Sequence, residues 1–312
     1  MELGIKNIKN SLISIFEGGM GNKFGCLFYA IQLSKETGKE LVINTVKNNG
    51  GDISFYDLFS KKNNYKEYLN TFTELDEVMS ADVPFLIHKG HFNFDRQIIS
   101  HRSLPHKEII NHINSYDVCG YLDDASSHAP ELWEHSQGNE ESNESMVIQT
   151  AKELIIKEDI LEKVTAFCSN NNINKDVAGV HIRATDWPWK DQTIKDSYET
   201  IQNLTNDNPD IKIFVCCDEK EVEDDLISQL PNNIITFEKN SYVKKFQEGD
   251  WRAKTKDVDG RVFDYNVLRD KESVIEAFID MLILSRTDIK YGHWASSFNY
   301  FAKVYSNVDI LK

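Results

Sequence analysis

The sequence predicts an α/β protein with parallel sheets, arranged as two domains. Short apolar runs alternate with segments of helical period in both halves of the chain, which is the pattern of buried parallel strands joined by helices. The 312 residues exceed the length of one typical domain. Polar residues directly follow two of the apolar runs, at the position where open parallel sheets bind their ligands.

The first strand, helix and strand are expected within residues 11–44. Leu12, Ile13 and Ile15 form a short apolar run, and the helical segment after it is expected to end at Gly38. One face of this helix carries four apolar residues at positions i, i+3, i+4 and i+7. They are Phe24, Leu27, Phe28 and Ile31.

A glycine-rich stretch, GGMGNK at residues 18–23, lies between this strand and this helix. Gly18, Gly19 and Gly21 allow the backbone to turn tightly and to approach a ligand, and the amides at the helix start can bind an anion. The glycine spacing differs from the dinucleotide fingerprint, which argues against a nicotinamide cofactor. A glycine-rich turn without a ligand is the alternative.

The second half of the chain repeats the alternation. Strands are expected at residues 177–182, 211–217 and 234–237, with a helix over residues 219–230. Such an order of elements predicts a second parallel sheet.

The domain boundary is expected at the polar run NNNINK, which separates a helix from the first strand of the second half. The two domains are then residues 1–172 and 173–312. A polar and acidic stretch over residues 134–146 predicts an exposed loop in the first domain.

The segment GVHIRATDW, residues 179–187, places Arg183 at the carboxyl end of a strand. A guanidinium group keeps its charge, and its planar fork matches phosphate oxygens in pairs, so this arginine predicts an anion site. The alternative is a structural ion pair between Arg183 and Asp186.

Asp218 ends its strand as Arg183 ends its own. A carboxylate there can accept hydrogen bonds from both N1 and the exocyclic amine of guanine. The alternative is that Asp218 caps the helix that follows it.

A third segment, near the end of the chain, combines a helix, a short strand and two serines. The helix that begins near Glu272 is apolar nearly all round, which predicts that it is buried. A strand is expected near residues 288–291, and Ser296 and Ser297 then start another helix. These hydroxyls either cap the helix or hold a pyrophosphate together with the helix-start amides.

Together these segments resemble the fucosyltransferase superfamily, notably the protein O-fucosyltransferases and the bacterial α1,2 and α1,6 enzymes. The order and spacing of the motifs agree with the family, whereas residues 47–117 and 240–271 match none of its blocks. The matching blocks are GGMGNK at 18–23, VCGYLDD at 118–124, HIRATDW at 181–187, IFVCCDE at 213–219 and ASSFNYFAK at 295–303.

The resemblance implies a GT-B glycosyltransferase with two Rossmann-like domains that face across a cleft. The N-terminal domain would lie on the acceptor side, and the C-terminal domain would bind a GDP-sugar. The implied reaction transfers fucose from GDP-fucose, with inversion, to a glycan or glycoconjugate acceptor, and it needs no metal or other cofactor. The alternatives are a GDP-sugar-binding protein without turnover, a transferase for a different GDP-sugar, and an unrelated α/β protein whose Arg183 is structural.

The resemblance also implies roles for residues in the matching motifs. Arg183 would hold the β-phosphate and stabilise the departing GDP, and Asp218 would receive the guanine. The other donor-binding residues would come from the glycine-rich stretch and the late serine motif. They are Gly19, Gly21, Asn22, Ser296, Ser297 and Phe298.

Around the transferred sugar, the resemblance implies that His181 and Asp186 orient the site. A catalytic base would be a carboxylate or an imidazole that faces the acceptor hydroxyl, and Glu17, Asp186 and His181 are the candidates. The family also contains members that need no base. One departure from the family pattern is Ala184, because many bacterial relatives carry a second arginine at this position.

Composition narrows the classes of partner. A net charge of −15 argues against nucleic acid or an anionic membrane surface as the main target. Five cysteines, with Cys216 and Cys217 adjacent on an expected buried strand, predict reduced thiols packed as small apolar groups. The opening residues lack the apolar core of a signal peptide, and no run of about 18 apolar residues could span a bilayer. A cytoplasmic enzyme is therefore expected.

Residues 240–271 form a long charged segment that contains Trp251, Arg252 and Arg261. Long loops in compact domains are usually functional or disordered. This segment is expected either to be a functional loop, which closes over the donor or contacts the acceptor, or to be disordered.

Overall fold

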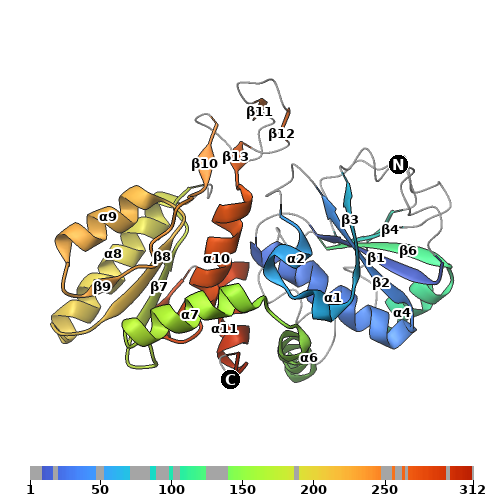
Figure 1. The fold of residues 1–312 in the computed structure, drawn as a ribbon, viewed down its shortest axis with the longest axis horizontal. Coiled ribbons are helices and arrows are strands. Elements are labelled where there is room, and N and C mark those ends of the chain that lie inside the picture. The colour runs from blue at the N-terminus through green and yellow to red at the C-terminus, as the bar shows by residue number, and fades with distance from the viewer. Residues whose placement is uncertain are drawn as a thin grey trace. The chain divides into compact units, whose positions relative to one another are not determined.

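The computed structural model describes residues 9–16, 20–46, 53–70, 85–88, 98–100, 106–123, 140–185, 190–246, 255–256, 262–263, 266–292 and 296–310. They divide into two compact units, each built on a parallel sheet (Figure 1). The first unit extends to Ile155, and the second begins at Ile156. This division lies before the expected boundary at residue 172. The reason is that the helix Glu158–Asn170 packs against the helix Lys271–Leu284 of the second unit.

The first unit contains a six-stranded sheet in the order β3-β2-β1-β6-β4-β5, and every neighbouring pair is parallel. Its strands are β1 (Ser11–Phe16), β2 (Glu40–Val46), β3 (Lys66–Asn70), β4 (Phe85–His88), β5 (Ile98–Ser100) and β6 (Val118–Asp123). Its helices are α1 (Met20–Thr37), α2 (Phe55–Leu58), the 3₁₀ helix η2 (Lys61–Asn63), α4 (His106–Asn114) and α6 (Glu140–Glu153).

Helix α1 confirms the predicted strand, helix and strand at the start of the chain. It ends at Thr37, and Gly38 follows with a positive φ of 66°, a conformation that glycine adopts without steric cost. The helix begins earlier than the glycine pattern suggested. Gly21 is its second residue, so the prediction that Gly21 belongs to the turn is wrong.

The prediction of an exposed loop over residues 134–146 is wrong from Glu140 onward, where α6 begins. Acidic residues in the first turn of a helix are stabilised by the helix dipole, so the polar sequence is compatible with a helix start. Val147, Thr150 and Ala151 are buried at helical spacing, and α6 packs against α1. This apolar face holds the helix in place although its first two turns are polar.

The second unit contains a four-stranded parallel sheet in the order β14-β7-β8-β9, together with two small antiparallel pairs, β10 with β13 and β11 with β12. Its strands are β7 (Ala178–Ile182), β8 (Ile213–Cys217), β9 (Ile234–Ile235), β10 (Lys244–Lys245), β11 (Thr255–Lys256), β12 (Val262–Phe263), β13 (Val267–Leu268) and β14 (Asp288–Tyr291). Its helices are α7 (Glu158–Asn170), α8 (Lys190–Asp207), α9 (Lys220–Gln229), α10 (Lys271–Leu284) and α11 (Ser297–Ser306).

Helices cover both faces of this second sheet. Alternate residues of β7 and β8, such as Val180 and Val215, pack with α8 and α9 in one apolar cluster. The intervening residues face α10, which lies on the other side of the sheet with α7 and α11 beside it (Figure 1). Gly179 shows how close this packing is, since an added Cβ would lie 2.1 Å from Oγ1 of Thr287. Helix α10 is buried, as its apolar sequence predicted.

All five cysteines are buried and free, which confirms the prediction of packed thiols. In the part of the chain that the structure describes, no helix is both long and apolar enough to cross a bilayer. The same residues contain no cluster of His, Cys, Asp and Glu that could hold a metal ion.

Candidate functional site

The carboxyl ends of β7 and β8 place two predicted site residues next to each other. The strands are parallel, and Ile182 pairs with Cys217. Arg183 follows the first of these residues and Asp218 follows the second, so they occupy equivalent positions on neighbouring strands. Strand β7 is the first strand of the second unit and has β8 on one side and β14 on the other, which makes it the topological switch point of the sheet. Ligands bind at such points in open α/β sheets.

Asp218 joins the two strand ends. Its Oδ1 accepts hydrogen bonds from the amides of Ala184, at 2.6 Å, and Thr185, at 3.1 Å. The hydroxyl of Thr185 donates in turn to the carbonyl of Asp218, at 3.1 Å. The carboxylate therefore holds the two residues after Arg183 against the end of β8.

The alternative role of Asp218, as a cap of the following helix, is wrong. Helix α9 begins at Lys220, and its N-cap residue is Glu219, whose side chain makes no capping hydrogen bond. A base would have to reach Asp218 through Oδ2, because Oδ1 already accepts two amides.

His181 and Phe298 bring the second and third predicted segments together. The two rings stack with centroids 4.4 Å apart and planes 15° apart. His181 is the fourth residue of β7, and Phe298 is the second residue of α11. His181 is only 8% exposed. This stack places the start of α11 at the end of β7, beside Arg183.

The first turn of α11 combines a cap with a close backbone approach. Ser296 is the N-cap, and its hydroxyl accepts from the amide of Asn299, at 3.4 Å, which confirms the capping role. Asn299 is buried, and its side chain lies directly against Gly292, where an added Cβ would lie 1.4 Å from Nδ2 of Asn299. The amides at this helix start are oriented to bind an anion, which leaves the pyrophosphate role open as well.

Two residues at this site, Glu219 and Thr185, were not predicted from the sequence. Burial, and after it the charge of Asp218, raise the pKa of the Glu219 carboxyl. A carboxyl with a raised pKa beside a ligand-binding strand end is a candidate for a functional role. The sequence could have indicated both residues, because Glu219 lies in the same motif as Asp218 and Thr185 lies in the same motif as Arg183.

Several predicted residues lie outside the described ranges. They include Glu17, Gly19 and Asp186, so the proposed ion pair between Arg183 and Asp186 is untested. In the first unit, Gly21 and Asn22 lie in the first turn of α1, and the side chain of Asn22 is not described. The structure thus brings together the site residues of the second unit: His181, Arg183, Asp218, Ser296, Ser297 and Phe298.

Comparison with known proteins adds to this geometry. No protein-family model matches the chain, and no curated protein matches its sequence. Solved structures, in contrast, match nearly all of it. The fucosyltransferase NodZ from Bradyrhizobium is 17% identical over 95% of this chain and 92% of its own, with a TM-score of 0.53. POFUT1 in complex with GDP-fucose is 14% identical over 96% and 95%, with a TM-score of 0.50. The chain has the fucosyltransferase fold.

A third structure with this fold, a mutant of Arabidopsis thaliana FUT1 in complex with GDP, is 11% identical over 96% of this chain and 69% of its own, with a TM-score of 0.57. The fucosyltransferase fold confirms the predicted α/β class, GT-B, with two Rossmann-like units. At these identities the likeness establishes the fold.

Ala184 is the position at which many bacterial members of the predicted family carry a second arginine. Its side chain is fully buried in the apolar cluster beneath α8 and α9. The neighbouring Arg183 is partly exposed. Only one of the two consecutive positions can therefore present its side chain to a ligand in this structure.

Proposed function

We propose that this protein is a glycosyltransferase that transfers fucose from GDP-fucose to a glycan or glycoconjugate, with inversion and without a metal. The observation that carries the proposal is the convergence of Arg183, Asp218 and the start of α11 at the switch point of the second sheet. Solved structures with this fold contain GDP or GDP-fucose, which supports the choice of donor.

In this proposal the second unit binds the donor. The Arg183 guanidinium and the amides at the start of α11 both present positive charge to the diphosphate. Negative charge grows on the diphosphate as the bond to the sugar breaks, and fixed donors aimed at that charge lower the barrier. Asp218 would accept from guanine through Oδ2.

His181 fits an orienting role better than that of a base. Its ring is buried and is covered on one face by Phe298, which restricts its access to an acceptor hydroxyl. Glu17 and Asp186 remain the candidate bases. The attacking hydroxyl would approach the sugar on the side opposite the diphosphate and would pass its proton to one of them or, late in the reaction, to water.

In this proposal the first unit binds the acceptor. Gly19, Gly21 and Asn22 of the same unit remain predicted contacts of the donor. We also propose a cytoplasmic site of action. The five free, buried cysteines support it, because unpaired thiols are typical of reducing compartments.

The first test is thermal stabilisation by GDP, GDP-fucose, GDP-mannose, UDP and ADP in the presence of a chelator. A ligand at 100 times its dissociation constant adds about 2.7 kcal/mol to the free energy of unfolding. We expect only guanine nucleotides to stabilise the wild type and expect Arg183→Ala to lose this response. Release of GDP from GDP-fucose in the presence of acceptors should fall by a factor of roughly 10² to 10³ in the same variant.

Arg286→Ala is the matched control. Arg286 is a half-buried arginine of the same unit, and its guanidinium donates to the carbonyl of Val308, at 3.0 Å. It precedes the amino end of β14, whereas the candidate site lies at the carboxyl ends of β7 and β8. This variant should unfold at a lower temperature but keep the full response to GDP. The proposal fails if no guanine nucleotide stabilises the wild type, and binding of GDP without transfer to any acceptor would support a binding protein instead.

A further inference from the structure

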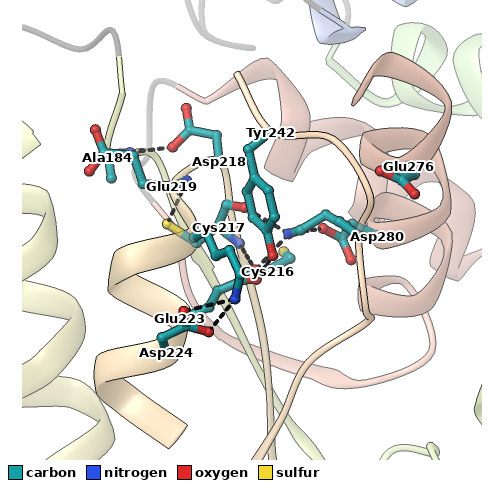
Figure 2. A network of polar contacts seen from close by, with 12 residues as sticks. Ala184, Cys216, Cys217, Asp218, Glu219, Glu223, Asp224, Tyr242, Glu276 and Asp280 are labelled. Carbon is teal, nitrogen blue, oxygen red and sulfur yellow. Dashed lines mark hydrogen bonds and ion pairs between the residues drawn. The ribbon is translucent and has the colours of Figure 1, made fainter. Parts of the chain in front are cut away.

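A buried cluster of charged side chains contacts Cys217, the last residue of β8 (Figure 2). Lys239 is its centre, and its side chain is 4% exposed. The ammonium group donates to Oε1 of Glu223, at 2.6 Å, to Oδ2 of Asp280, at 2.9 Å, and to the carbonyl of Cys217, at 2.7 Å. It also lies 4.8 Å from the ring centre of Tyr242. One lysine thus joins the segment after β9 to β8, α9 and α10.

Cys217 is held on both sides by this cluster. Its carbonyl accepts from Lys239, and its amide donates to Oε1 of Glu223, at 2.9 Å. Asp218 is the next residue. The two peptide groups that set the direction of the chain into Asp218 are therefore tied to buried, charged side chains.

The cluster is also connected to the loop after β7, which carries Arg183. Lys239 and Glu223 hold Cys217, Cys217 leads into Asp218, and Asp218 holds the amides of Ala184 and Thr185. Arg183 immediately precedes these amides. A chain of hydrogen bonds and covalent bonds therefore connects the buried lysine to the loop that carries this arginine.

Stabilisation of the fold alone does not explain why these charged side chains are buried together. Burial alone would lower the pKa of Lys239, but Asp280 and Glu223 hold it above its ordinary value, so the lysine stays charged. Burial raises the pKa of Asp280 to about 7, although Lys239 opposes this shift and Glu223 and Glu276 add to it. Buried ion pairs of this kind are often replaced by apolar side chains without loss of stability.

Of the two carboxylates, Glu223 is the better satisfied. It accepts from the ammonium group, from the Cys217 amide and, through Oε2, from the hydroxyl of Tyr242, at 2.7 Å. Among the described residues, Oδ1 of Asp280 has no hydrogen-bond donor. The cluster is thus anchored most firmly where it touches Cys217.

We propose that Lys239, together with Glu223, is a positioning residue that fixes Asp218 and through it the Arg183 loop for binding of a nucleoside diphosphate. The identity of the ligand rests on the function proposed above, whereas the mechanical link from Lys239 to the loop does not. Neither residue touches the ligand in this scheme.

The test of the link is amide hydrogen exchange at Ala184 and Thr185 without any ligand. In Lys239→Met, exchange at both amides should become faster by roughly tenfold, which corresponds to about 1.4 kcal/mol of local stabilisation. Glu223→Gln should show a smaller change in the same direction, and it serves as the second variant if Lys239→Met does not fold. Lys175→Met is the matched control.

Lys175 also belongs to the second unit, but it is exposed, unlike Lys239. Its ammonium group donates to the carbonyls of Ser285, at 3.1 Å, and Thr287, at 2.7 Å, but makes no contact with Cys217. Its loss should lower the unfolding temperature without a selective change at Ala184 and Thr185. Unchanged exchange at these two amides in both cluster variants, or an equal change in the Lys175 variant, would overturn the link.

Calorimetric titration with GDP then tests the consequence for binding. Lys239→Met should weaken GDP binding by roughly tenfold, whereas Lys175→Met should bind as the wild type does. Equal affinity in Lys239→Met and the wild type would overturn the positioning role. A wild type that binds no GDP would instead refute the proposed function, and the exchange measurement would still decide the link.

Discussion

Asp218→Asn should separate the observed role of Asp218, which is to hold the Arg183 loop, from its proposed role, which is to receive guanine. The asparagine keeps one oxygen acceptor but loses the charge, and its second oxygen becomes an amide donor. Oδ1 accepts from two backbone amides, at 2.6 and 3.1 Å. A hydrogen bond to a charged group contributes about 1.5–3 kcal/mol and a neutral one about 0.5–1.5 kcal/mol.

The two bonds together should lose about 2 kcal/mol, with the partial exposure of Asp218 favouring the lower values for each bond. This loss corresponds to roughly 30-fold in affinity if loop order is needed for binding. We therefore expect GDP to bind Asp218→Asn about 10- to 30-fold more weakly in a calorimetric titration.

Inosine diphosphate distinguishes recognition of the base from loop order, because it lacks the exocyclic amine of guanine. The wild type should prefer GDP to inosine diphosphate by roughly fivefold, the effect of one neutral hydrogen bond. Asp218→Asn should lose this preference, whereas Glu219→Gln, a neighbouring carboxylate without a cap bond, should keep it. If Asp218→Asn keeps the preference and Glu219→Gln loses it, the assignment of guanine to Asp218 is wrong.

Two further predictions concern stability. Gly179→Ala places a Cβ 2.1 Å from Thr287 Oγ1, and overpacking of this kind should lower the free energy of unfolding by about 1–3 kcal/mol in thermal denaturation; an unchanged midpoint would mean that Thr287 moves away freely. Asp280 has a pKa that burial raises from 3.8 to about 7, so its contribution to stability is present below about pH 4 and is lost as the pH rises to about 7. Asp280→Asn should remove this part of the pH dependence in denaturant titrations, and an unaltered pH profile would exclude Asp280 as its source.

The fold could be predicted where local pattern and tertiary role agree. The strand expected at residues 288–291 is β14, with the same bounds, and the helix that is apolar nearly all round is the buried α10. Strand β9 is shorter than the expected 234–237, because strand length is set by pairing with a neighbour. Helix α6 was missed because its polar first turns resemble a loop, and its apolar face becomes clear only with α1 beside it.

The placement of the candidate site residues could be predicted from the sequence, but the contacts between them could not. Arg183, Asp218 and Ser296 each follow or begin an element that the pattern identifies, so their common edge could be inferred. The hydrogen bond from Ala184 to Asp218 depends on the register of β7 and β8, which cannot be predicted from the sequence. Lys239 was not predicted because a lysine in a charged segment is normally solvated, and only the tertiary fold buries it.

The burial of Ala184 limits how the proposed donor site of this protein can change. An arginine at this position would have to carry its guanidinium into the apolar cluster beneath α8 and α9, where an unpaired charge is strongly unfavourable. A single substitution therefore cannot convert the pocket into one with two consecutive arginines. Engineering of such a pocket would have to begin with the helices that cover the sheet.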